Sequence, residues 1–249
     1  MYSINHEEIV ELYNGKTDDI GNSWFIGEAL NVYYDYKKTG IWQNTPEDLA
    51  EIAKFNANGH KFEPGMIKLL DINGDYKITA DDDRMILGQA RPKHIFNLGN
   101  TFLYKGFDLG VDMYATLGGM LRDATRINHQ SYRNNSVKVD YWTPDNPTNA
   151  YPRPNRLYDN IDYESALYYQ NSDFLRIKTV TLGYTLPKTL VGKATLSNCR
   201  VYVTAQNPFL FTRFTGIDPE GAATTSSGSS RSYPAPSVSS WLVGLNVSF

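Results

Sequence analysis

"FNLGNTFLYKGFDLGVDMYATLG", residues 96–118, decides the fold class of this chain. Apolar side chains alternate with polar or small ones on both sides of Lys105 and Gly106, and this two-residue period is that of a β-strand. Lys105 and Gly106 alone separate the two runs, and glycine supplies the positive φ that a two-residue turn needs. Asp108 and Asp112 lie on the polar side of the second run. The stretch therefore predicts an antiparallel hairpin with one apolar face and one wet face.

The end of the chain repeats this alternation. One side of the predicted strand carries Trp241, Val243, Leu245, Val247 and Phe249, and the other side carries Leu242, Gly244, Asn246 and Ser248. A tilted strand of this length crosses roughly 20 Å, with an aromatic residue at each end, as in an outer-membrane barrel. A sandwich strand with one buried face fits the same alternation. The aromatic residue at position 249 favours the membrane strand.

Two more strands are predicted, at residues 173–187 and 199–209. In the first of them, Leu175 and Ile177 lie in one phase of the alternation, and Val180 and the apolar residues after it lie in the other. A β-bulge near residues 178–179 would bring the two halves into register.

The connections between these strands alternate in length. The connections at 105–106 and 187–198 are short or moderate, whereas those at 119–172 and 211–237 are long and polar. Short turns on one rim and long loops on the other are typical of outer-membrane barrels, in which the long loops are extracellular.

Residues 13–93 form the longest irregular stretch. Within it, "TPEDLAEIAKF" at 45–55 predicts a short helix, with Thr45 as the N-cap and Pro46 in the first turn. A loop of this length inside one domain normally has a function.

Composition excludes several classes of protein. The formal net charge of -3 provides no strong field for nucleic acid, and the single Cys199 excludes an internal disulfide or a multi-thiolate zinc site. No apolar run is long enough for a membrane-spanning helix, but a mean hydropathy of -0.45 is compatible with transmembrane strands. Asp81, Asp82 and Asp83 form a charge run without a nucleophile or base, so no enzyme is predicted.

"DINGDYKITADDD", residues 71–83, resembles a calcium-binding loop. Oxygen ligands would come from Asp71, Asn73, Asp75, the backbone carbonyl of Lys77, and Asp82 at position 12 of the template. Two departures weaken the match, because Tyr76 occupies the glycine position and Asp82 is shorter than the usual glutamate. "GMIKLL" before the loop predicts a strand rather than a helix. The alternative is a solvated turn at Asn73 and Gly74 that needs no ion.

The aromatic pair Tyr141 and Trp142 in "YWTPDNP" leaves two interpretations open. The rings could stack on a sugar, or they could fix the long loop to the rim of a barrel, which is the commoner use of aromatic residues there.

Several stretches together resemble the SusC/RagA-like TonB-dependent outer-membrane transporters of Bacteroidetes. They run in order over residues 22–249: "WFIGEALNVYYDYKKTGIWQ", "PGMIKLLDINGDYKITADDDRMILGQARP", "NTFLYKGFDL", "YWTPDNP", "FLRIKTVTLGYTLP", "RVYVTAQNPFLFT" and "GLNVSF". The resemblance implies an all-β fold in the cell outer membrane: about five to six C-terminal strands of an antiparallel transmembrane β-barrel of the 22-strand type, with long extracellular loops.

The resemblance also implies how the chain is organised. Residues 1–12 would contain the end of a strand, 13–93 a long extracellular loop, and 94–249 barrel strands and their loops. The sequence has no recognisable signal peptide, TonB box or plug domain, so we expect a C-terminal portion, from a truncated reading frame or a split polypeptide. Trp241, Val243, Leu245, Val247 and Phe249 would form the signal for the barrel-assembly machinery.

In this family, a glycan or peptide binds beneath a SusD-like surface lipoprotein, and TonB acts on the plug to open a path. For the parent protein, the resemblance therefore implies import of glycans or oligopeptides, with outer-membrane lipid around the barrel and no required cofactor except possible Ca²⁺ in the loop. The sequence identifies neither the substrate-binding residues nor the nutrient. The alternative is a soluble all-β binding module with a calcium-stabilised loop, in which the faces bearing Val111, Met113, Val243 and Val247 are buried against a second sheet.

Overall fold

A long antiparallel sheet dominates the structure. The computed structural model describes residues 1–123, 138–154, 161–191, 196–220 and 237–249. The sheet has six strands in the order β1-β6-β7-β10-β11-β12, and every neighbouring pair is antiparallel. Their bounds are β1 Tyr2–Ile4, β6 His94–Tyr104, β7 Phe107–Leu117, β10 Phe174–Thr185, β11 Asn198–Thr212 and β12 Ser240–Ser248. The five predicted long strands are confirmed, and β1 is a short sixth strand beside β6.

The predicted hairpin and bulge are both present. Lys105 and Gly106 join β6 to β7 with φ values of 49° and 88°, the left-handed region that a two-residue hairpin turn uses. In β10, the register shifts between Ile177 and Thr179 against both of its neighbours. Against β7, Lys178 is the extra residue, whereas against β11 the two residues 207–208 lie opposite Lys178. The bulge restores the alternation, so apolar residues before and after it lie on the same face of the sheet.

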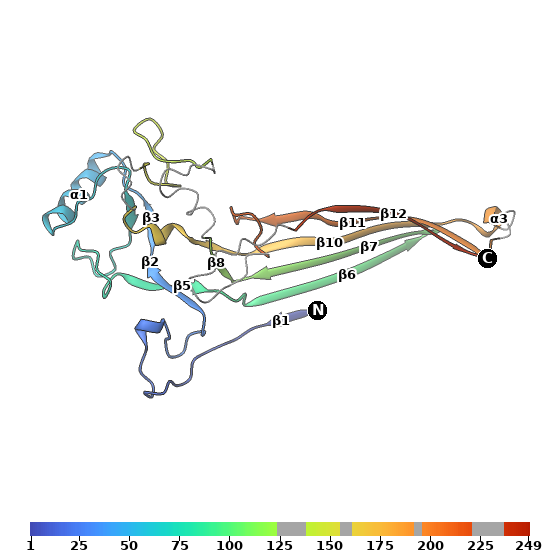
Figure 1. Ribbon diagram of the computed structural model, residues 1–249, viewed down its shortest axis with the longest axis horizontal. Coiled ribbons are helices and arrows are strands. Elements are labelled where there is room, and N and C mark those ends of the chain that lie inside the picture. Colours follow the sequence, from blue (N-terminus) through green and yellow to red (C-terminus); the bar gives the residue numbers. More distant parts are fainter. Residues whose placement is uncertain (124–137, 155–160, 192–195, 221–236) are drawn as a thin grey trace.

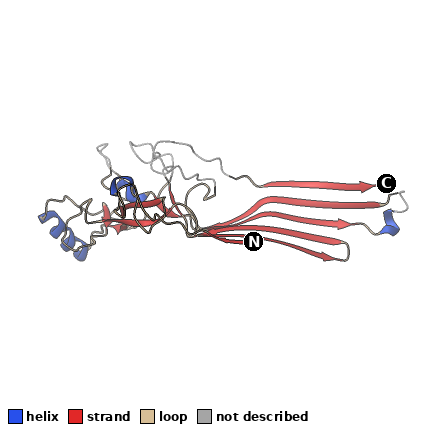
Figure 2. Cartoon of the chain, turned by 90° about the horizontal axis from the view of Figure 1, so that it is seen from below, coloured by secondary structure: helices blue, strands red, loops and turns tan. Residues whose placement is uncertain are grey.

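Connections of different length lie at opposite ends of the sheet, as Figures 1 and 2 show. The tight turn at 105–106 and the connection containing the short helix α3 (Lys188–Val191) lie at one end, near the C-terminus. The region before β6 extends from the other end, as do the described residues that follow β7 and residues 213–220 after β11. The predicted alternation of short and long connections is confirmed.

The region before β6 contains more regular structure than predicted. Its elements are η1 Ile20–Asn22, β2 Val32–Tyr36, β3 Lys38–Ile41, α1 Pro46–Ala57, β4 Ile67–Leu69 and β5 Arg84–Gln89. β2 pairs with β5, and β3 pairs with β4. The segment after β7 adds β8 Met120–Arg122, η3 Glu164–Leu167 and β9 Tyr169–Asn171, with β8 paired to β9. We call residues 32–90, 138–154 and 161–172 together the head.

α1 begins as the sequence predicts. The Thr45 side chain accepts a hydrogen bond from the backbone N–H of Asp48, and Pro46 opens the first turn. None of the helices in the described ranges is long and apolar enough to cross a membrane.

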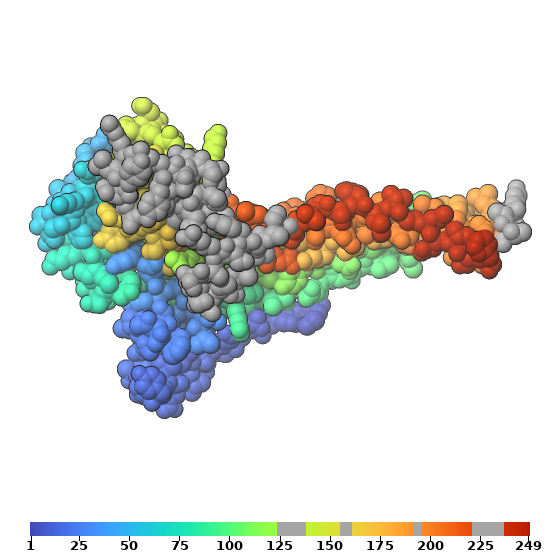
Figure 3. All heavy atoms as spheres, viewed as in Figure 1, coloured from blue at the N-terminus to red at the C-terminus, as the bar shows by residue number. Residues whose placement is uncertain are grey.

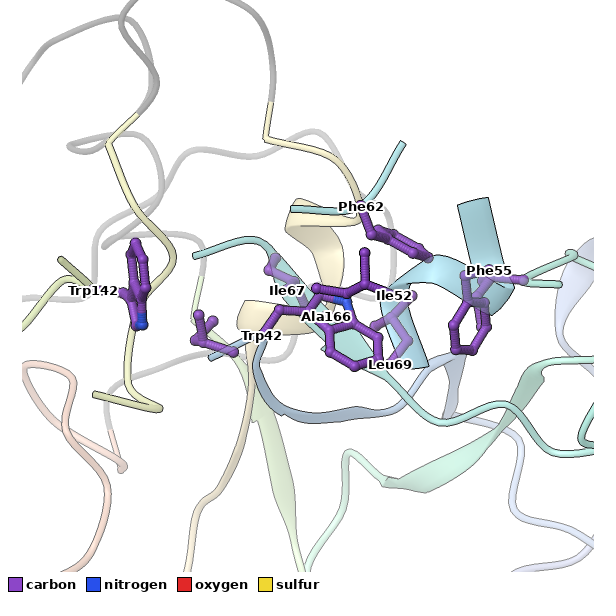
Figure 4. Packing of buried hydrophobic residues seen from close by; sticks show 10 residues of the cluster. Trp42, Ile52, Phe55, Phe62, Ile67, Leu69, Trp142 and Ala166 are labelled. Atoms are coloured by element: carbon purple, nitrogen blue, oxygen red, sulfur yellow. The ribbon is translucent and has the colours of Figure 1, made fainter. Parts of the chain in front are cut away.

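The head has a hydrophobic core of its own, so residues 13–93 are not the irregular loop that was predicted. Its buried members are Ile41, Trp42, Ile52, Phe55, Phe62, Ile67, Leu69, Ile78, Trp142 and Ala166. Figure 4 shows Trp42, Ile52 and Leu69 pointing toward one another beside α1. Trp42 and Phe55 meet edge to face, with ring centroids 5.8 Å apart. The head therefore buries apolar side chains from several segments that are distant in sequence.

Among the residues that the structure describes, the long sheet has no second layer of the kind that a sandwich requires. Val243 is 77% exposed and Val247 37% exposed, and within the described ranges the other sheets are two-stranded. Figure 3 shows the strands of the long sheet extending away from the head as a long projection. The alternative of a soluble β-sandwich is therefore wrong for this part of the chain.

Candidate functional site

One face of the long sheet is almost continuously apolar. Because partners in the register share a face, Leu109, Leu182, Val203 and Val243 form one row across four strands. The amide Asn100, the register partner of Val111, interrupts this face. We call it the apolar face; its apolar members are Phe96, Leu98, Phe102, Tyr104, Phe107, Leu109, Val111, Met113, Ala115, Leu175, Ile177, Val180, Leu182, Tyr184, Cys199, Val201, Val203, Ala205, Phe209, Phe211, Trp241, Val243, Leu245 and Val247. Many of its side chains are exposed, and no described part of the chain covers them as a second layer. Such a band is expected where a strand faces lipid.

The opposite face carries charged, hydroxyl and amide groups. We call it the polar face; its polar members include Asn97, Thr101, Asp108, Asp112, Tyr114, Thr116, Arg176, Thr179, Thr181, Thr185, Arg200, Tyr202, Thr204, Gln206, Ser240 and Asn246. The hydroxyls of Thr181 and Thr204, which are direct register partners, lie 2.9 Å apart in a hydrogen bond. Strands with one apolar and one polar face form the wall of a water-filled barrel.

An ion pair on the polar face crosses a glycine near the end of the sheet that carries the 105–106 turn. Arg200 of β11 donates from Nε to Asp108 of β7 over 2.9 Å, and its second nitrogen contacts the other carboxylate oxygen. β10 lies between these strands, and a Cβ at its Gly183 would lie 2.4 Å from atoms of both Asp108 and Arg200. Gly183 therefore allows the bidentate pair to bridge three strands.

Glycine has the same role beside the edge strand. A Cβ at Gly244 would lie 2.2 Å from the Tyr202 ring, so this ring lies directly over the β12 backbone. The Arg200 guanidinium lies 4.9 Å from the centroid of the same ring. Tyr202 thus links the ion pair to the last strand.

A second charge network lies where the polar face meets the head. Arg176 and Asp218 are 3% and 4% exposed, and Arg176 donates to an Asp218 oxygen over 2.6 Å. The Arg176 Nε lies 2.8 Å from Glu220, and the bulge residue Lys178 contacts the other oxygen of Glu220. The bulge therefore brings two cations to two carboxylates that follow β11.

Asp218 also joins both ends of the segment between β11 and β12. One of its oxygens accepts from the backbone N–H of Glu220 and the other from that of Ser237, each over 2.9 Å. Burial, the largest effect, opposes ionisation, yet these N–H donors together with Arg176 lower the pKa of Asp218 below its usual value. Its carboxylate fixes the base of the segment to the barrel wall. This network was not predicted from the sequence.

The predicted barrel-assembly residues lie on the outermost strand. Trp241 is 73% exposed, Leu245 61% and Phe249 93%, and Val243 and Val247 lie on the same face. β12 pairs only with β11 within the described ranges, so its other edge is unpaired there. Recognition of this strand by an assembly machinery stays a prediction.

Side-chain oxygens in the predicted calcium loop are used to brace the turn. Asp71 accepts from the backbone N–H of Gly74 over 2.8 Å and from that of Tyr76 over 2.9 Å. Tyr76, at the glycine position of the template, has a φ of 58°. Its ring packs on Phe55 at 5.6 Å, with the Lys54 amine 4.7 Å from its centroid, and these contacts hold a non-glycine residue in the left-handed region.

The remaining candidate ligands also bond locally. The Asn73 side-chain oxygen accepts a hydrogen bond from the backbone N–H of Asp75. The Asp75 carboxylate accepts one from the backbone N–H of Lys77, and the Asp82 carboxylate accepts one from the Thr79 hydroxyl. No group of three or more His, Cys, Asp or Glu side chains in the described parts of the chain could hold a metal ion. The residues present fit a self-braced turn, and we assign no step to calcium.

Asp83, rather than Asp82, is the acid that organises this loop. Asp83 is fully buried and accepts from the backbone N–H groups of Ile72 over 2.9 Å and of Thr79 over 2.8 Å. Its carboxylate therefore joins the two ends of the loop. From the sequence, Asp83 was predicted to be part of a solvated charge run, because a run of three aspartates does not indicate which of them is buried.

Replacing Asp83 with alanine is expected to lower the free energy of unfolding of the head by about 2–3 kcal/mol, because two backbone donors lose a charged acceptor. Asp82→Ala is the matched control, with an expected loss below about 1 kcal/mol, because Asp82 is exposed. Hydrogen exchange of the 71–83 amides measures both effects. If millimolar calcium protects these amides and EDTA reverses the protection, the self-braced turn is wrong.

Trp142 pins its loop to the head. Its ring is 5% exposed, and Nε1 donates to the Gln43 side-chain oxygen over 2.8 Å. This supports the interpretation of Trp142 as a loop anchor, although it anchors to the head rather than to the rim of the sheet. Tyr141 is 45% exposed and does not belong to the core cluster.

Together, these features define a class. A sheet of long antiparallel strands with an apolar outer face, a polar opposite face and its long connections at one end is a segment of an outer-membrane β-barrel.

Comparison with known proteins narrows this class to a family. No protein-family model matches the chain. TonB-dependent receptor P26 of Formosa agariphila is 31% identical over 273 residues, which cover 100% of this chain and 26% of the receptor. TonB-dependent receptor P3 of the same organism is 31% identical over 78% of this chain and 19% of its own length. TonB-dependent receptor SusC of Bacteroides thetaiotaomicron is 28% identical over 98% of this chain and 23% of its own length.

Solved structures agree on the fold. The RagAB peptide transporter matches with a TM-score of 0.67 and 21% identity, over 100% of this chain and 26% of that chain. The RagAB peptide importer in its open-open state matches with a TM-score of 0.66. The chain belongs to the SusC/RagA-like family of TonB-dependent receptors, which are proteins of the outer membrane and not enzymes. It spans about a quarter of the length of the relatives that it matches.

Proposed function

We propose that this chain forms part of the wall and of the extracellular loops of an outer-membrane transporter that imports glycans or oligopeptides. The observation that supports this most is the division of the long sheet into an apolar face and a polar face, with the head and the long connections at one end. The apolar face would contact lipid and the polar face would line the path of the cargo. The head would lie on the extracellular side, together with the rest of residues 13–93.

A surface lipoprotein like SusD is the proposed partner at the head, and TonB would supply energy through a plug domain. The support for this partnership is the family membership of the chain. One of the similar structures is described as a peptide importer, which supports a peptide as the cargo. A glycan is the second proposed cargo, and it rests on the family resemblance of the sequence.

Two adjacent residues of β6 test the membrane orientation. Leu98 on the apolar face is 53% exposed, and Asn97 on the polar face is also exposed. Leu98→Arg is expected to cost about 2–4 kcal/mol, because an arginine near the bilayer midplane is destabilising, whereas Asn97→Arg should cost less than about 1 kcal/mol. Folded protein in isolated outer membranes, measured by its heat-dependent gel mobility, reports the difference.

Transport is tested by the uptake of labelled oligosaccharides and oligopeptides into the cells that produce these variants. Uptake should fall with the amount of folded Leu98→Arg protein and stay near the unmodified level for Asn97→Arg. Equal tolerance of both arginines, or recovery of a folded chain without detergent, would overturn the barrel-wall assignment. Normal folding without any cargo uptake would overturn the transport assignment alone.

A further inference from the structure

A cavity of about 600 Å³ lies among residues of the head and Thr215, which follows β11. Its walls come from β2, β3, β5, β8, η3 and β9, together with Lys37, residues 138–140 and 150–151, and Thr215. Cavities of this volume hold small ligands or a few units of an oligomer. It is separate from the charge networks of the polar face, because neither Arg176 nor Arg200 lines it.

Apolar side chains form part of this cavity. Met85, Ile86 and Leu87 of β5 line it together with Met120 of β8 and Leu167 of η3. Methionine side chains adapt to irregular ligands, and a ring or an aliphatic stem can pack on such a surface. The apolar part of the wall therefore suits the backbone of an oligomer rather than an isolated ion.

Charge in the cavity is predominantly positive. Three lysines line it, Lys37, Lys38 and Lys138, against a single carboxylate, Asp140. Asp140 is already satisfied, because it accepts from the Asn146 side chain over 2.8 Å and from the Thr148 hydroxyl over 2.6 Å. These hydrogen bonds favour its ionised form and lower its pKa. The Asp140 carboxylate is therefore already hydrogen-bonded within its own loop.

The three lysines are not equivalent. The Lys38 amine donates to the carbonyls of Asn149 and Ala150 over 2.7 and 2.8 Å, so Lys38 holds the loop that forms one wall. The amines of Lys37 and Lys138 have no hydrogen-bond or ion-pair partner among the described residues, and both side chains are exposed. Two cations are therefore free to bind an anion at this cavity.

We infer that this cavity binds a carboxylate-bearing oligomer, with Lys37 and Lys138 contacting its acidic groups and the apolar wall contacting its backbone. The shared chemistry is the carboxylate, which an acidic oligosaccharide or an acidic peptide can supply. This inference rests on the proposed function only for the delivery of the oligomer, because binding itself is measurable on the purified protein.

Calorimetry on the protein purified in detergent tests the inference with three probes: trigalacturonic acid, triglutamate and the neutral maltotriose. At least one of the acidic probes should bind about tenfold or more tightly than maltotriose, and the stronger one identifies the source of the carboxylate. Raising the salt concentration should weaken acidic binding, because partly exposed charges are screened.

Lys37→Ala and Lys138→Ala should each weaken binding of the preferred acidic probe about five- to tenfold, in line with the loss of one charge-assisted contact. Lys61→Ala is the control, since Lys61 is an exposed lysine of the head that does not line the cavity. All three variants should melt at the temperature of the unmodified protein, and Lys37→Arg should retain binding.

Equal affinity for neutral and acidic probes, or unchanged affinity in Lys37→Ala and Lys138→Ala, would overturn the inference. Such a result leaves the membrane and uptake tests with Leu98→Arg unaffected. Conversely, acidic binding that depends on both lysines would survive a failure of the uptake test, so the two proposals are separable.

Discussion

Replacing Arg176 with methionine lowers the free energy of unfolding by about 3–5 kcal/mol, the largest effect that we expect from a charged residue of this chain. Methionine keeps much of the volume of the side chain but leaves Asp218 and Glu220 without their main cation. Because Asp218 is 4% exposed, its charge cannot be solvated by water in place of the guanidinium. Urea unfolding of the protein in detergent measures the loss.

A surface ion pair provides the matched control. Arg91 and Glu7 form an ion pair over 2.6 Å, with the Arg91 side chain 61% exposed. Arg91→Met should therefore change stability by less than about 1 kcal/mol. If the two methionine variants unfold at the same urea concentration, the Arg176 network does not stabilise the barrel wall.

The pH dependence of the free energy of unfolding, measured by the same urea unfolding, follows from Asp218. Its pKa is lowered in the folded protein, so the folded state binds fewer protons than the unfolded state in this range. The stabilisation is therefore fully present above the ordinary aspartate value of 3.8 and is lost as the pH falls through the lower pKa of the folded protein. Arg176→Met should shift the onset of this loss to higher pH, because one of the groups that favour the ionised carboxylate is removed.

The strands of the long sheet were predictable because their signal is local. In β7, each apolar residue is followed by a polar or small one, and the two-residue period is sufficient to assign both faces. The bulge at Lys178 was also predictable, since the phase of the alternation changes once within β10. Contact with lipid requires this alternation on every spanning strand, so the strands can be recognised in the sequence.

The charge networks were not predictable, because their partners are far apart in the chain. Arg200 and Asp108 are 92 residues apart, and Arg176 and Asp218 are 42 residues apart. Each residue alone has the pattern of a polar position on a strand or in a loop. Only the register of three strands reveals that Gly183 leaves space for the Asp108–Arg200 pair.

The hydrophobic core of the head was not predicted for a similar reason. Its core joins α1 to Trp142 and Ala166, which belong to the segment that follows β7. Alternation or helical periodicity within residues 13–93 cannot show that a later segment completes the core. The helix itself was assigned correctly because its N-cap and proline are local signals.

Replacing Phe55 with alanine is expected to destabilise the head by about 3–5 kcal/mol, because the lost ring leaves a cavity in a packed core. Phe55 is 2% exposed and packs against Trp42, Phe62 and Tyr76 with ring centroids 5.6 to 5.8 Å apart. Loss of the ring also removes a contact that holds Tyr76 at positive φ. Leu49→Ala in the same helix is the matched control, with a loss below about 1 kcal/mol, since Leu49 is 43% exposed.

Hydrogen exchange locates this effect within the molecule. The long sheet is held by its own ladder of paired strands, and none of the residues in the head core lies on β6, β7, β10, β11 or β12. Amides of α1 and of the 71–83 loop should therefore exchange faster in Phe55→Ala, while those of β7 and β10 keep their protection. If protection of β7 and β10 falls in parallel with that of α1, the head and the sheet unfold as one cooperative unit. Preserved protection of the sheet would instead mean that the head can be altered without loss of the barrel wall.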